Sequence, residues 1–572
     1  MVFLFVGEKG KIMKIEVLLT VAAIVIFFVV KAVYDYFYDK KRLETYLAES
    51  FGCLPDCEYR VGKLDSIKAF YNMDSSDGDL DDITWNDLEM DELYKILNHT
   101  RSAMGEEVLY KLLRKPVFNK DILDKRNKLI DYFLENESDR IAIEKKLSRI
   151  GKDSKLSFYE YFMLLDNVKK EKPVIHYIIN LIWLVCIAGL LFNYSIFAGV
   201  LIFNILFSIG SYYRRKAHIE MYYHVFNQVI KMLYCAENIG KSNIDIIKEQ
   251  TSVINACIKK YKGFKRNSSL VLKANGGNLS DIVFDYFRML THVDLIKFDS
   301  MHRFIMENQD TLLKIHEEIG YIDFVIAIAS FRKMNEKKGL CIPEFTKEKR
   351  ILRFSDGYHP FIEEPVYNSF DTSNCVLLTG SNASGKSTFL KMTAINAILA
   401  QTIVTVCAKK YISSFYHVMT SMALTDNIFG SKSYFIVEIM SLKRIVDASQ
   451  NEDVLSCIDE VLRGTNTIER IAASSEILRA LSYTNTLCFA ATHDIELAHI
   501  LENCYNNYHF EESVTEDDVV FDYKIHDGYS KTRNAIKLLS VLGFDSNIVN
   551  GAKNMAASFE KNGLWDIYMD NT

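Results

Sequence analysis

Residues 380–388 contain a glycine-rich loop that fixes the local fold around it. The loop reads G-S-N-A-S-G-K-S-T and fits the pattern G-x-x-x-x-G-K-[ST]. An apolar run, Val376 to Leu378, precedes it, and a helix-prone run, Phe389 to Met392, follows it. In such a strand–loop–helix unit the glycines let backbone amides turn inward on phosphates, and the positive end of the helix dipole adds to the attraction. The sequence therefore predicts a chain that binds and hydrolyses a nucleotide.

Individual residues of this loop have predicted roles. The Lys386 ammonium can reach the β and γ phosphates, and the Ser387 hydroxyl can coordinate Mg²⁺. The remaining loop positions that are candidate phosphate contacts are Gly380, Asn382, Gly385 and Thr388. The predicted cofactors are therefore a nucleoside triphosphate and Mg²⁺.

Two carboxylates follow a second apolar run further along the chain. Val454 to Ile458 leads into Asp459 and Glu460, as expected for a buried strand with catalytic groups at its C-terminal end. Asp459 is predicted to hold Mg²⁺ through water. Glu460 is predicted to orient or deprotonate the attacking water, because phosphoryl transfer depends mainly on positioning and charge neutralisation. An ordinary exposed acidic pair is the alternative.

A histidine ends a third apolar run. Thr486 to Ala491 is followed by Thr492, His493 and Asp494. A lone histidine is usually structural, but at the end of a core strand it could sense the γ-phosphate. His493 is therefore the second candidate catalytic residue beside Glu460.

Four segments together resemble the MutS ATPases. They are T-G-S-N-A-S-G-K-S-T-F-L-K around the loop, F-G-S-K-S-Y-F-I-V-E-I at 429–439, C-I-D-E-V-L-R-G-T-N-T at 457–467 and A-T-H at 491–493. The resemblance implies an ABC-type ATPase domain that uses ATP and works as a homodimer. Each composite site would combine Lys386 and Glu460 of one subunit with Ser433, in the signature segment, of the other.

The resemblance extends to the flanking stretches. D-G-Y-H-P at 356–360 is similar to the start of the MutS ATPase domain, and residues 527–544 resemble the C-terminal helical segment that dimerises it. Leu93 to Phe133 resembles the start of the MutS helical core and lever domain, and no counterpart of a mismatch-reading domain is recognisable before it. Tyr367, near the first strand of the ATPase domain, is the aromatic residue that the resemblance suggests for stacking on adenine.

Two uncharged apolar segments predict contact with a membrane. Val17 to Val30 is predicted to be an N-terminal anchor; a cleaved signal peptide is the alternative, but no small-residue cleavage site follows. Val174 to Tyr213 contains no Asp, Glu, Lys or Arg. Because it is about twice the length needed to cross a bilayer once, it predicts a transmembrane hairpin, with a buried pair of soluble helices as the alternative.

Basic residues follow the first segment and flank the hairpin at both ends, although Lys9, Lys11 and Lys14 also precede the first segment. The three groups are Lys40, Lys41 and Arg42 after the first segment, Lys169, Lys170 and Lys172 before the hairpin, and Arg214, Arg215 and Lys216 after it. The positive-inside rule then places both ends of the hairpin in the cytoplasm. The predicted location is the cell membrane, with a multi-pass chain whose ATPase domain lies on the cytoplasmic side. The 11 scattered cysteines agree with reduced thiols in that compartment.

One basic stretch is the candidate contact for DNA. The formal net charge of −6 does not favour nucleic acid, so any such surface must be local. The stretch comprises Lys259, Lys260, Tyr261, Lys262, Phe264, Lys265 and Arg266. Its pattern suits phosphates and stacked bases, and it suits anionic lipid headgroups equally well. A solvated helix end is the simplest interpretation.

The predicted fold class is an α/β ABC-type P-loop ATPase domain toward the C-terminus, preceded by an all-α core and lever domain with transmembrane helices. The predicted boundaries are a membrane anchor at 1–45, a linker at 46–87, a helical domain at 88–338 interrupted by the hairpin at 174–213, the ATPase domain at 339–530 and a helical dimerisation segment at 531–572.

Two functions remain open at this point. The first is a membrane-anchored, MutS-like, Mg-dependent ATPase that acts on DNA in mismatch repair or recombination. The second is a membrane-associated ABC-type ATPase that drives remodelling or transport without DNA. The hairpin lies roughly where the DNA-gripping clamp of MutS would leave the helical core, which keeps the second function open.

Overall fold

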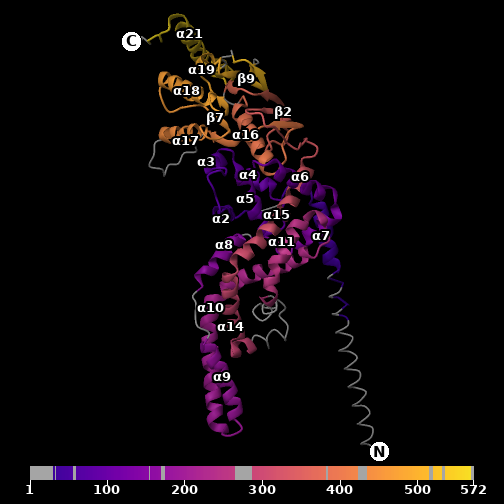
Figure 1. Ribbon diagram of the computed structural model, residues 1–572. Helices are drawn as coiled ribbons and strands as arrows, with labels where there is room; N and C mark the ends of the chain where they lie inside the picture. The colour runs from indigo at the N-terminus through magenta and orange to yellow at the C-terminus, as the bar shows by residue number, and fades with distance from the viewer. Residues whose placement is uncertain are drawn as a thin grey trace, which may run out of the picture.

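The computed structural model describes most of the chain between residues 37 and 567, together with Phe27, Val30, Lys31, Tyr34 and Asp35 (Figure 1). The gaps within this range are 56–58, 154, 169–173, 265–285, 382–383, 423–433, 515–518 and 531–534. Several predicted residues lie outside the described part: most of the N-terminal anchor, the lysines before the hairpin, Asn382, Ser433, Lys265 and Arg266.

Helices make up the first half of the chain. Before the hairpin they are α2 (Lys63–Asn72), α3 (Asp82–Asp87), α4 (Met90–Leu97), α5 (Ala103–Arg114), α6 (Lys120–Glu135), α7 (Glu137–Leu147), α8 (Phe158–Met163) and η1 (Leu164–Asn167). After it they are η2 (Asp245–Ile247), α11 (Lys248–Ile258), η3 (Lys259–Tyr261), α14 (Val293–Glu307) and α15 (Gln309–Met334). Helix α15 is central, because α5, α6 and α11 all pack against it.

The contact between α5 and α15 depends on two glycines and a buried carboxylate. A Cβ atom at Gly105 would lie 2.2 Å from the Asp323 carboxylate, and one at Gly320 would lie 2.6 Å from the Met104 carbonyl oxygen. The two helices can therefore approach closely only where side chains are absent. Asp323 is fully buried and accepts hydrogen bonds from the backbone amides of Arg101 and Ser102, at the start of α5.

A long hairpin projects from this helical region. It is formed by α9 (Val174–Gly189) and by α10 (Tyr194–Gly240), which continues from the hairpin into the helical core without interruption (Figure 1). Asn193 caps α10 by accepting a hydrogen bond from the Ile196 amide. The two helices of the predicted hairpin are thus present. Among the described residues, Tyr194–Ile219 is one helical segment long and apolar enough to cross a membrane, and α9 is apolar but shorter.

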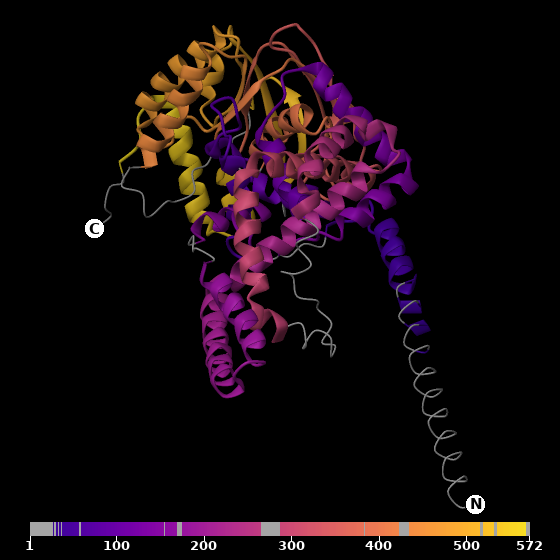
Figure 2. The same cartoon turned by 60° about the horizontal axis from the view of Figure 1, so that its bottom comes forward.

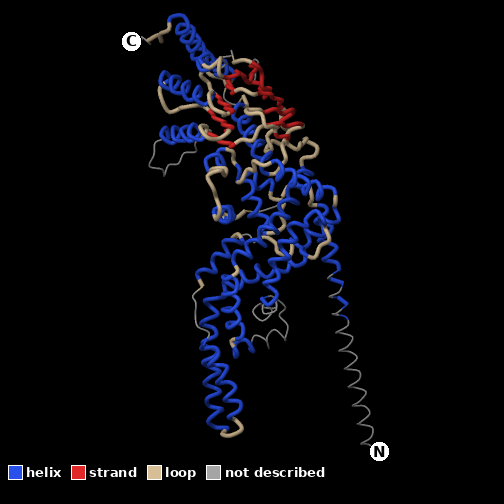
Figure 3. The backbone as a smooth tube through the Cα atoms, in the orientation of Figure 1, coloured by secondary structure: helices blue, strands red, loops and turns tan. Residues whose placement is uncertain are grey.

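Two β-sheets follow the helical region and lie at one end of the molecule (Figure 3). The larger has the order β10-β9-β4-β8-β7-β6, formed by β4 (Cys375–Thr379), β6 (His417–Ser421), β7 (Val454–Asp459), β8 (Leu487–Ala491), β9 (Tyr505–Val514) and β10 (Val519–Asp527). All neighbours in it are parallel except β9 and β10. The smaller has the order β1-β5-β2-β3, formed by β1 (Glu344–Phe345), β2 (Leu352–Gly357), β3 (Asn368–Thr372) and β5 (Lys410–Ser413).

Helices accompany the larger sheet. They are α16 (Lys386–Thr402), α17 (Tyr434–Ala448), α18 (Thr467–Ser482) and α19 (Ile495–Ile500), followed by α20 (Ala535–Val541) and α21 (Ser546–Asn562). Strands β4 and β8 are buried along their whole length, which explains why they read as continuous apolar runs. The predicted order of a helical region followed by a mixed α/β domain is confirmed.

Helix α3 ties the helical region to the edge strand of the larger sheet. The Asp87 carboxylate accepts hydrogen bonds from the Thr420 hydroxyl at 2.6 Å and from the Met422 amide at 3.0 Å. The Thr84 hydroxyl accepts one from the Thr420 amide at 3.1 Å. These bonds hold the end of β6, which leads into the segment before α17.

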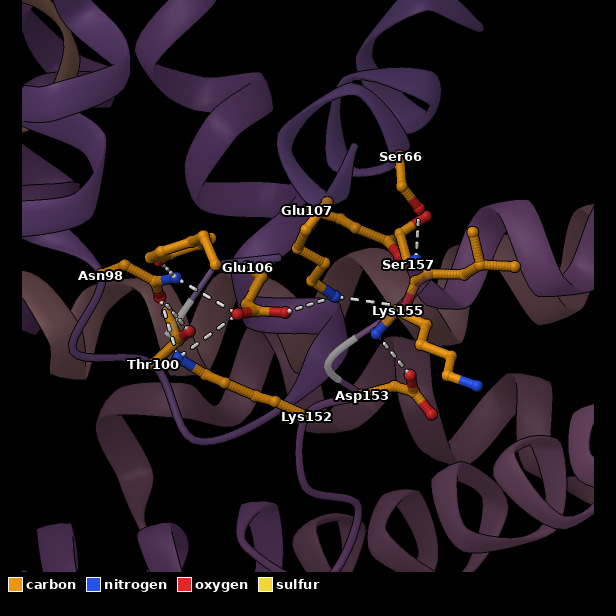
Figure 4. A network of polar contacts seen from close by, with 12 residues as sticks. Ser66, Asn98, Thr100, Glu106, Glu107, Lys152, Asp153, Lys155 and Ser157 are labelled. Atoms are coloured by element: carbon orange, nitrogen blue, oxygen red, sulfur yellow. Dashed lines mark hydrogen bonds and ion pairs between the residues drawn. The ribbon is translucent and has the colours of Figure 1, made fainter. Parts of the chain in front are cut away.

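A buried polar network joins α2, α5 and the loop after α7 (Figure 4). At its centre Lys63 and Glu106 form an ion pair of 3.2 Å, and their side chains are 3% and 4% exposed. The Lys63 ammonium also donates to the Leu156 carbonyl oxygen at 3.2 Å, and the Asn98 amide donates to Glu106 at 3.3 Å. Because each charge is removed from water, each depends on its partners here.

Replacing Glu106 by glutamine should therefore destabilise the helical region. The substitution leaves the Lys63 ammonium buried without its counter-charge, which we expect to cost about 3–5 kcal/mol in the free energy of unfolding. Urea unfolding followed by circular dichroism measures this. Glu92→Gln is the matched control: its ion pair with Lys95 is on the surface, with side chains 58% and 34% exposed, and its loss should cost under about 1 kcal/mol. Equal losses for the two variants would contradict the account.

Candidate nucleotide-binding site

Parallel pairing brings the predicted site residues to one edge of the larger sheet. Strand β4 pairs with β8, with Leu378 opposite Ala491, and β7 pairs with β8, with Asp459 opposite the same Ala491. The chain therefore leaves all three strands at the same level. The phosphate loop after β4, Glu460 after β7 and His493 after β8 meet where α/β sheets bind their ligands.

The loop itself has the backbone conformation that its glycines permit. Gly380 has a φ of +142° and Gly385 a φ of +110°, both in the region that side chains disfavour. A Cβ atom at Gly380 would also lie 3.0 Å from the Phe510 carbonyl oxygen. Helix α16 begins directly after the loop at Lys386, so its free N-terminal amides and dipole point toward the place of the phosphates.

The Lys386 side chain lies inside the loop. It is 4% exposed, and its ammonium donates to the carbonyl oxygens of Gly380 at 2.8 Å and Ser381 at 2.6 Å. Burial lowers the pKa of Lys386 to about 8, although the nearby carboxylates of Asp459, Glu460 and Glu512 work in the opposite direction. The loop thus holds a buried cation whose charge is easily lost at alkaline pH.

A hydroxyl and a carboxylate form the candidate magnesium site. The Ser387 hydroxyl donates to the Asp459 carboxylate at 2.6 Å. Both offer oxygen atoms, the ligand type that Mg²⁺ prefers, and Mg²⁺ commonly keeps several waters and takes further oxygens from substrate phosphates. Within the described residues no group of three or more His, Cys, Asp or Glu side chains could hold a metal. The pair therefore fits a Mg²⁺ ion that arrives with a nucleotide better than a permanent all-protein metal site.

Glu460 is held in place by its neighbours on both sides. Its carboxylate lies 3.0 Å from the His493 Nε2 atom and forms an ion pair with Arg463. Its backbone has a φ of +54° and its amide donates to the Ala491 carbonyl oxygen at 3.0 Å. A non-glycine residue in this conformation is strained, as residues at functional sites often are. These contacts fix the position of the carboxylate at the end of β7.

Arg463 and Glu512 were not expected from the sequence. Arg463 lies three residues after Glu460. A positive charge this close in sequence to the predicted catalytic carboxylate could have suggested an ion pair between the two. Glu512 accepts a hydrogen bond from the Ser381 hydroxyl of the phosphate loop, but it comes from β9, far along the chain. Only the pairing of β4 with β9 brings it to the loop.

A pocket of 220 Å³ lies beside the phosphate loop. Its lining comprises His359, Ile362, Glu364, Val366, Asn368, Gly385, Thr388, Phe389, Met392, Phe510 and Tyr523. The pocket is largely apolar and adjoins Gly385 and Thr388 of the loop. Its position and character suit the base of a nucleotide whose phosphates occupy the loop.

Tyr367, predicted to stack on adenine, is not among the residues that line this pocket. Its ring packs against the Tyr358 ring, with centroids 5.6 Å apart. Val366 and Asn368 line the pocket, and in an extended chain the residue between them points to the opposite side. Tyr367 lies directly before β3, between two residues that line the pocket, and its contact with adenine stays a prediction.

Tyr523 lines the pocket together with Phe389 and Phe510, and it is the most exposed of the three. It lies at an irregularity of β10 and has a φ of +54°. Asn368 fixes this bulge, because its amide donates to the Tyr523 carbonyl oxygen and its side-chain oxygen accepts from the Ile525 amide, both at 3.0 Å. The Tyr523 ring comes within 3.3 Å of a Cβ atom built on Gly385. No local motif marks a bulge of this kind, so the sequence offered no signal for it.

The basic stretch after α11 differs from its prediction. Tyr261 and Phe264 are buried, and the Tyr261 hydroxyl donates to the Asn308 carbonyl oxygen at 2.9 Å. The two rings belong to the hydrophobic core, so they cannot stack on bases. Lys259, Lys260 and Lys262 are exposed and form the part of the stretch that remains available to phosphates.

Comparisons with known proteins agree with the geometry of the site. Residues 376–560 match the family model of MutS domain V. The DNA mismatch repair protein MutS of Leptospira interrogans is 30% identical over 288 residues, which are 48% of this chain and 33% of that protein. The DNA mismatch repair protein MutS of Staphylococcus carnosus is 26% identical over 261 residues, which are 43% of this chain and 30% of that protein.

The fold and the site define a P-loop α/β domain attached to a helical region. The comparisons show that this domain is similar to domain V of the MutS proteins, over residues 376–560. The chain spans about a third of the length of the curated relatives it matches. The matched part contains the phosphate loop, Asp459, Glu460 and His493.

The lowered pKa of Lys386 predicts how nucleotide affinity depends on pH. Negative phosphates favour the protonated ammonium, so affinity should be full below pH 8 and should fall as the pH rises above about 8, by up to about tenfold per pH unit. Calorimetric titration with a non-hydrolysable nucleotide measures this dependence. Lys386→Arg is the control, because a guanidinium stays charged in this range and its affinity should stay flat. An identical decline in both proteins would assign the effect to another group.

Proposed function

We propose that the protein is a dimeric, Mg²⁺-dependent ATPase of the MutS type. The observation that carries the proposal is the convergence of Lys386, the Ser387–Asp459 pair and the Glu460–His493 pair at the ends of three parallel strands. The match to MutS domain V supports ATP as the nucleotide. Phosphoryl transfer requires a phosphate cradle, a metal site and a group that orients water, and these residues supply each of them.

Each residue has a distinct role in the proposed reaction. The phosphate loop and Lys386 would bind the β and γ phosphates. Ser387, and Asp459 through water, would hold Mg²⁺, which would supply charge neutralisation at the phosphates. Glu460 accepts a hydrogen bond from the attacking water and aligns it with the γ phosphate. His493 and Arg463 act through Glu460 by holding its two carboxylate oxygens, so they are positioning residues. Tyr523 offers a ring for the adenine base.

A second copy of the chain is the proposed partner. An apolar groove between α17 and α18 is lined by Phe435, Ile439, Leu442, Val446, Leu462 and Ile477, among others. Further exposed apolar side chains lie toward the C-terminus, including Leu542, Phe544 and Ile548. Such surfaces support dimerisation, since large apolar patches commonly mark interfaces. Ser433, which the resemblance assigns to the nucleotide site of the partner, lies outside the described residues.

Two substitutions separate binding from hydrolysis. Lys386→Ala removes the cation inside the loop and should abolish tight ATP binding. Glu460→Gln keeps the shape of the side chain but weakens its hold on water, so ATP should still bind while hydrolysis falls by about a hundredfold or more and an ATP-bound dimer accumulates. Nucleotide binding, phosphate release and size-exclusion chromatography with light scattering measure the three effects. Equal hydrolysis by Glu460→Gln and the wild type would refute the role of Glu460.

DNA is the proposed substrate of the ATPase cycle, in mismatch repair or recombination. The support is the printed function of the matched relatives, DNA mismatch repair, together with the exposed lysines at 259, 260 and 262. The alternative is an ATPase that drives a remodelling or transport-linked process at a membrane without DNA. The apolar hairpin favours this alternative, because it lies roughly where the DNA-gripping clamp of MutS would leave the helical core.

DNA binding separates these two functions. If DNA is the substrate, the purified protein should bind duplex, mismatched or branched DNA with an affinity that falls steeply with salt, and DNA should change its rate of ATP hydrolysis. Replacing the three exposed lysines by glutamine should remove about one phosphate contact per lysine. The logarithm of the DNA-binding constant should then fall less steeply with the logarithm of the salt concentration. Fluorescence anisotropy at several salt concentrations measures both. Unchanged ATPase rates and no binding at low salt would favour the alternative.

The proposed location is the cell membrane, with the ATPase domain on the cytoplasmic side. The support is the exposure of large apolar side chains along the hairpin and at Phe27, Val30 and Phe37 near the N-terminus. Figures 1 and 2 show the hairpin and the described start of the chain on the side of the helical region that faces away from the ATPase domain. One lipid surface could therefore cover both.

A further inference from the structure

The turn that carries Glu460 has a strained backbone. Glu460 has a φ of +54° and Leu462 a φ of +59°, so two non-glycine residues of one short turn lie in the left-handed region. Side chains disfavour this region, and the conformation persists only where the surrounding structure imposes it. The groups that impose it therefore also set the position of the Glu460 carboxylate.

A buried carboxylate of α17 caps this turn. The Arg463 backbone amide donates to the Glu438 Oε1 atom at 3.2 Å, and Glu438 is only 7% exposed. Burial raises the pKa of Glu438, while the backbone amides of Arg463 and Leu462 favour its charged form. A carboxylate removed from water depends on the donors that face it. Glu438 and the middle of the turn therefore hold each other in place.

Close packing joins the same two segments. Helices α17 and α18 lie side by side next to β7, and the turn runs from β7 to α18 (Figure 1). A Cβ atom at Gly464 would lie 3.0 Å from the Phe435 ring of α17, so any side chain there would press on the helix. Leu462 of the turn and Leu442 of α17 belong to one buried hydrophobic cluster. The position of α17 is therefore transmitted to the turn.

Helix α18 holds the two ends of the turn. The Ser474 hydroxyl donates to the Val461 carbonyl oxygen at 3.3 Å. The Asn466 side chain caps α18 by accepting hydrogen bonds from the amides of Ile468 and Glu469 at 3.0 and 3.1 Å. These bonds fix Val461 and Asn466, while the bond to Glu438 holds Arg463 between them.

Arg463 connects the cap to the candidate catalytic carboxylate. Its amide is the group bound to Glu438, and its guanidinium forms the ion pair with the Glu460 carboxylate. Arg463 thus links two carboxylates, one through its backbone and one through its side chain. Because Arg463 and Glu460 belong to the same turn, a change in the cap would displace both of them.

We propose that Glu438 is a positioning residue for ATP hydrolysis, which holds the Glu460 carboxylate in place through the turn at residues 460–464. This inference rests on the proposed ATPase function and adds a link from α17 to the catalytic carboxylate. Glu438 acts through Arg463 and Glu460. Since Phe435 and Ile439 of α17 line the groove proposed to receive a second copy of the chain, dimerisation would reach Glu460 by the same route.

A positioning role and a purely structural role predict different kinetics. The phosphate loop follows β4 and the Lys386 ammonium is bound by carbonyl oxygens of that loop, so neither depends on the Glu438 carboxylate. Loss of positioning should therefore lower kcat and leave nucleotide affinity unchanged. Loss of folding should lower both, together with the melting temperature.

Substitution of Glu438 in the purified full chain tests the role. Glu438→Ala removes the cap, and kcat should fall by about ten- to a hundredfold because the water-orienting carboxylate is displaced. Affinity for a non-hydrolysable ATP analogue should stay within about twofold of the wild type, since phosphate binding rests on the loop. Glu438→Gln keeps an oxygen that can accept from the Arg463 amide, so its kcat should stay within about threefold of the wild type. Steady-state kinetics and calorimetric titration measure these values.

Glu476→Ala is the matched control on the neighbouring helix. Glu476 forms a surface ion pair with Arg479, and the two side chains are 66% and 52% exposed. Such a pair contributes little to stability and lies outside the turn, so both kcat and analogue affinity should be unchanged.

A double-mutant cycle shows whether Glu438 acts through Glu460. In single-turnover assays, Glu438→Ala should have no further effect once Glu460→Gln is present, because the group that it positions is already disabled. An equal fold-loss in both backgrounds would overturn the proposal. An unchanged kcat in Glu438→Ala would also overturn it, and parallel losses of kcat, analogue affinity and melting temperature would assign Glu438 to folding alone. Absence of hydrolysis by the wild type would instead overturn the proposed function, and this inference with it.

Discussion

The parallel pairing of β4, β8 and β7 is the constraint on which the rest of the site depends. Each strand is apolar and buried, so its register is fixed by packing on both faces. With Leu378 and Asp459 both opposite Ala491, the chain must leave the three strands at one level. A phosphate loop, two carboxylates and a histidine that are far apart in sequence are thereby brought within contact. A shift of one residue in either pairing would turn Asp459 away from Ser387.

The helical region and the larger sheet share one continuous hydrophobic core, and specific polar contacts also join them. Asp87 and Thr84 hold the end of β6, and Arg332 of α15 donates to Thr405 and to the Val404 carbonyl oxygen. On its other side the region continues into the hairpin through the uninterrupted helix α10. The hairpin is therefore an extension of the same helical framework that contacts the edge of the larger sheet. This framework connects the candidate nucleotide site to the apolar tip of the hairpin.

Much of the nucleotide site was predictable because its residues follow short local motifs. Lys386, Ser387, Asp459, Glu460 and His493 each end or follow an apolar run, and the structure brings them together as that pattern indicates. Tyr523, Arg463 and Glu512 were missed, because a strand bulge, a left-handed turn and a distant strand place them. Tyr261 was misjudged for a related reason: interleaved basic and aromatic residues look alike whether the rings face solvent or the core.

For the apolar hairpin too, some properties were predictable from the sequence and others depend on the tertiary structure. Composition and the uncharged length of residues 174–213 predicted two helices and a need for an apolar environment, since those properties are local and additive along the chain. How far the hairpin projects depends on residues 286–294, which are distant in sequence and cover its base with polar contacts.

The sequence by itself determined the phosphate loop, the strand-end carboxylates and the apolar character of the hairpin, because each is written in neighbouring residues. Only the tertiary structure decided which aromatic rings line the apolar pocket beside the phosphate loop, what holds Glu460 and how much of the hairpin is free. These features depend on contacts between segments far apart in the chain, and such contacts form only when the whole core packs.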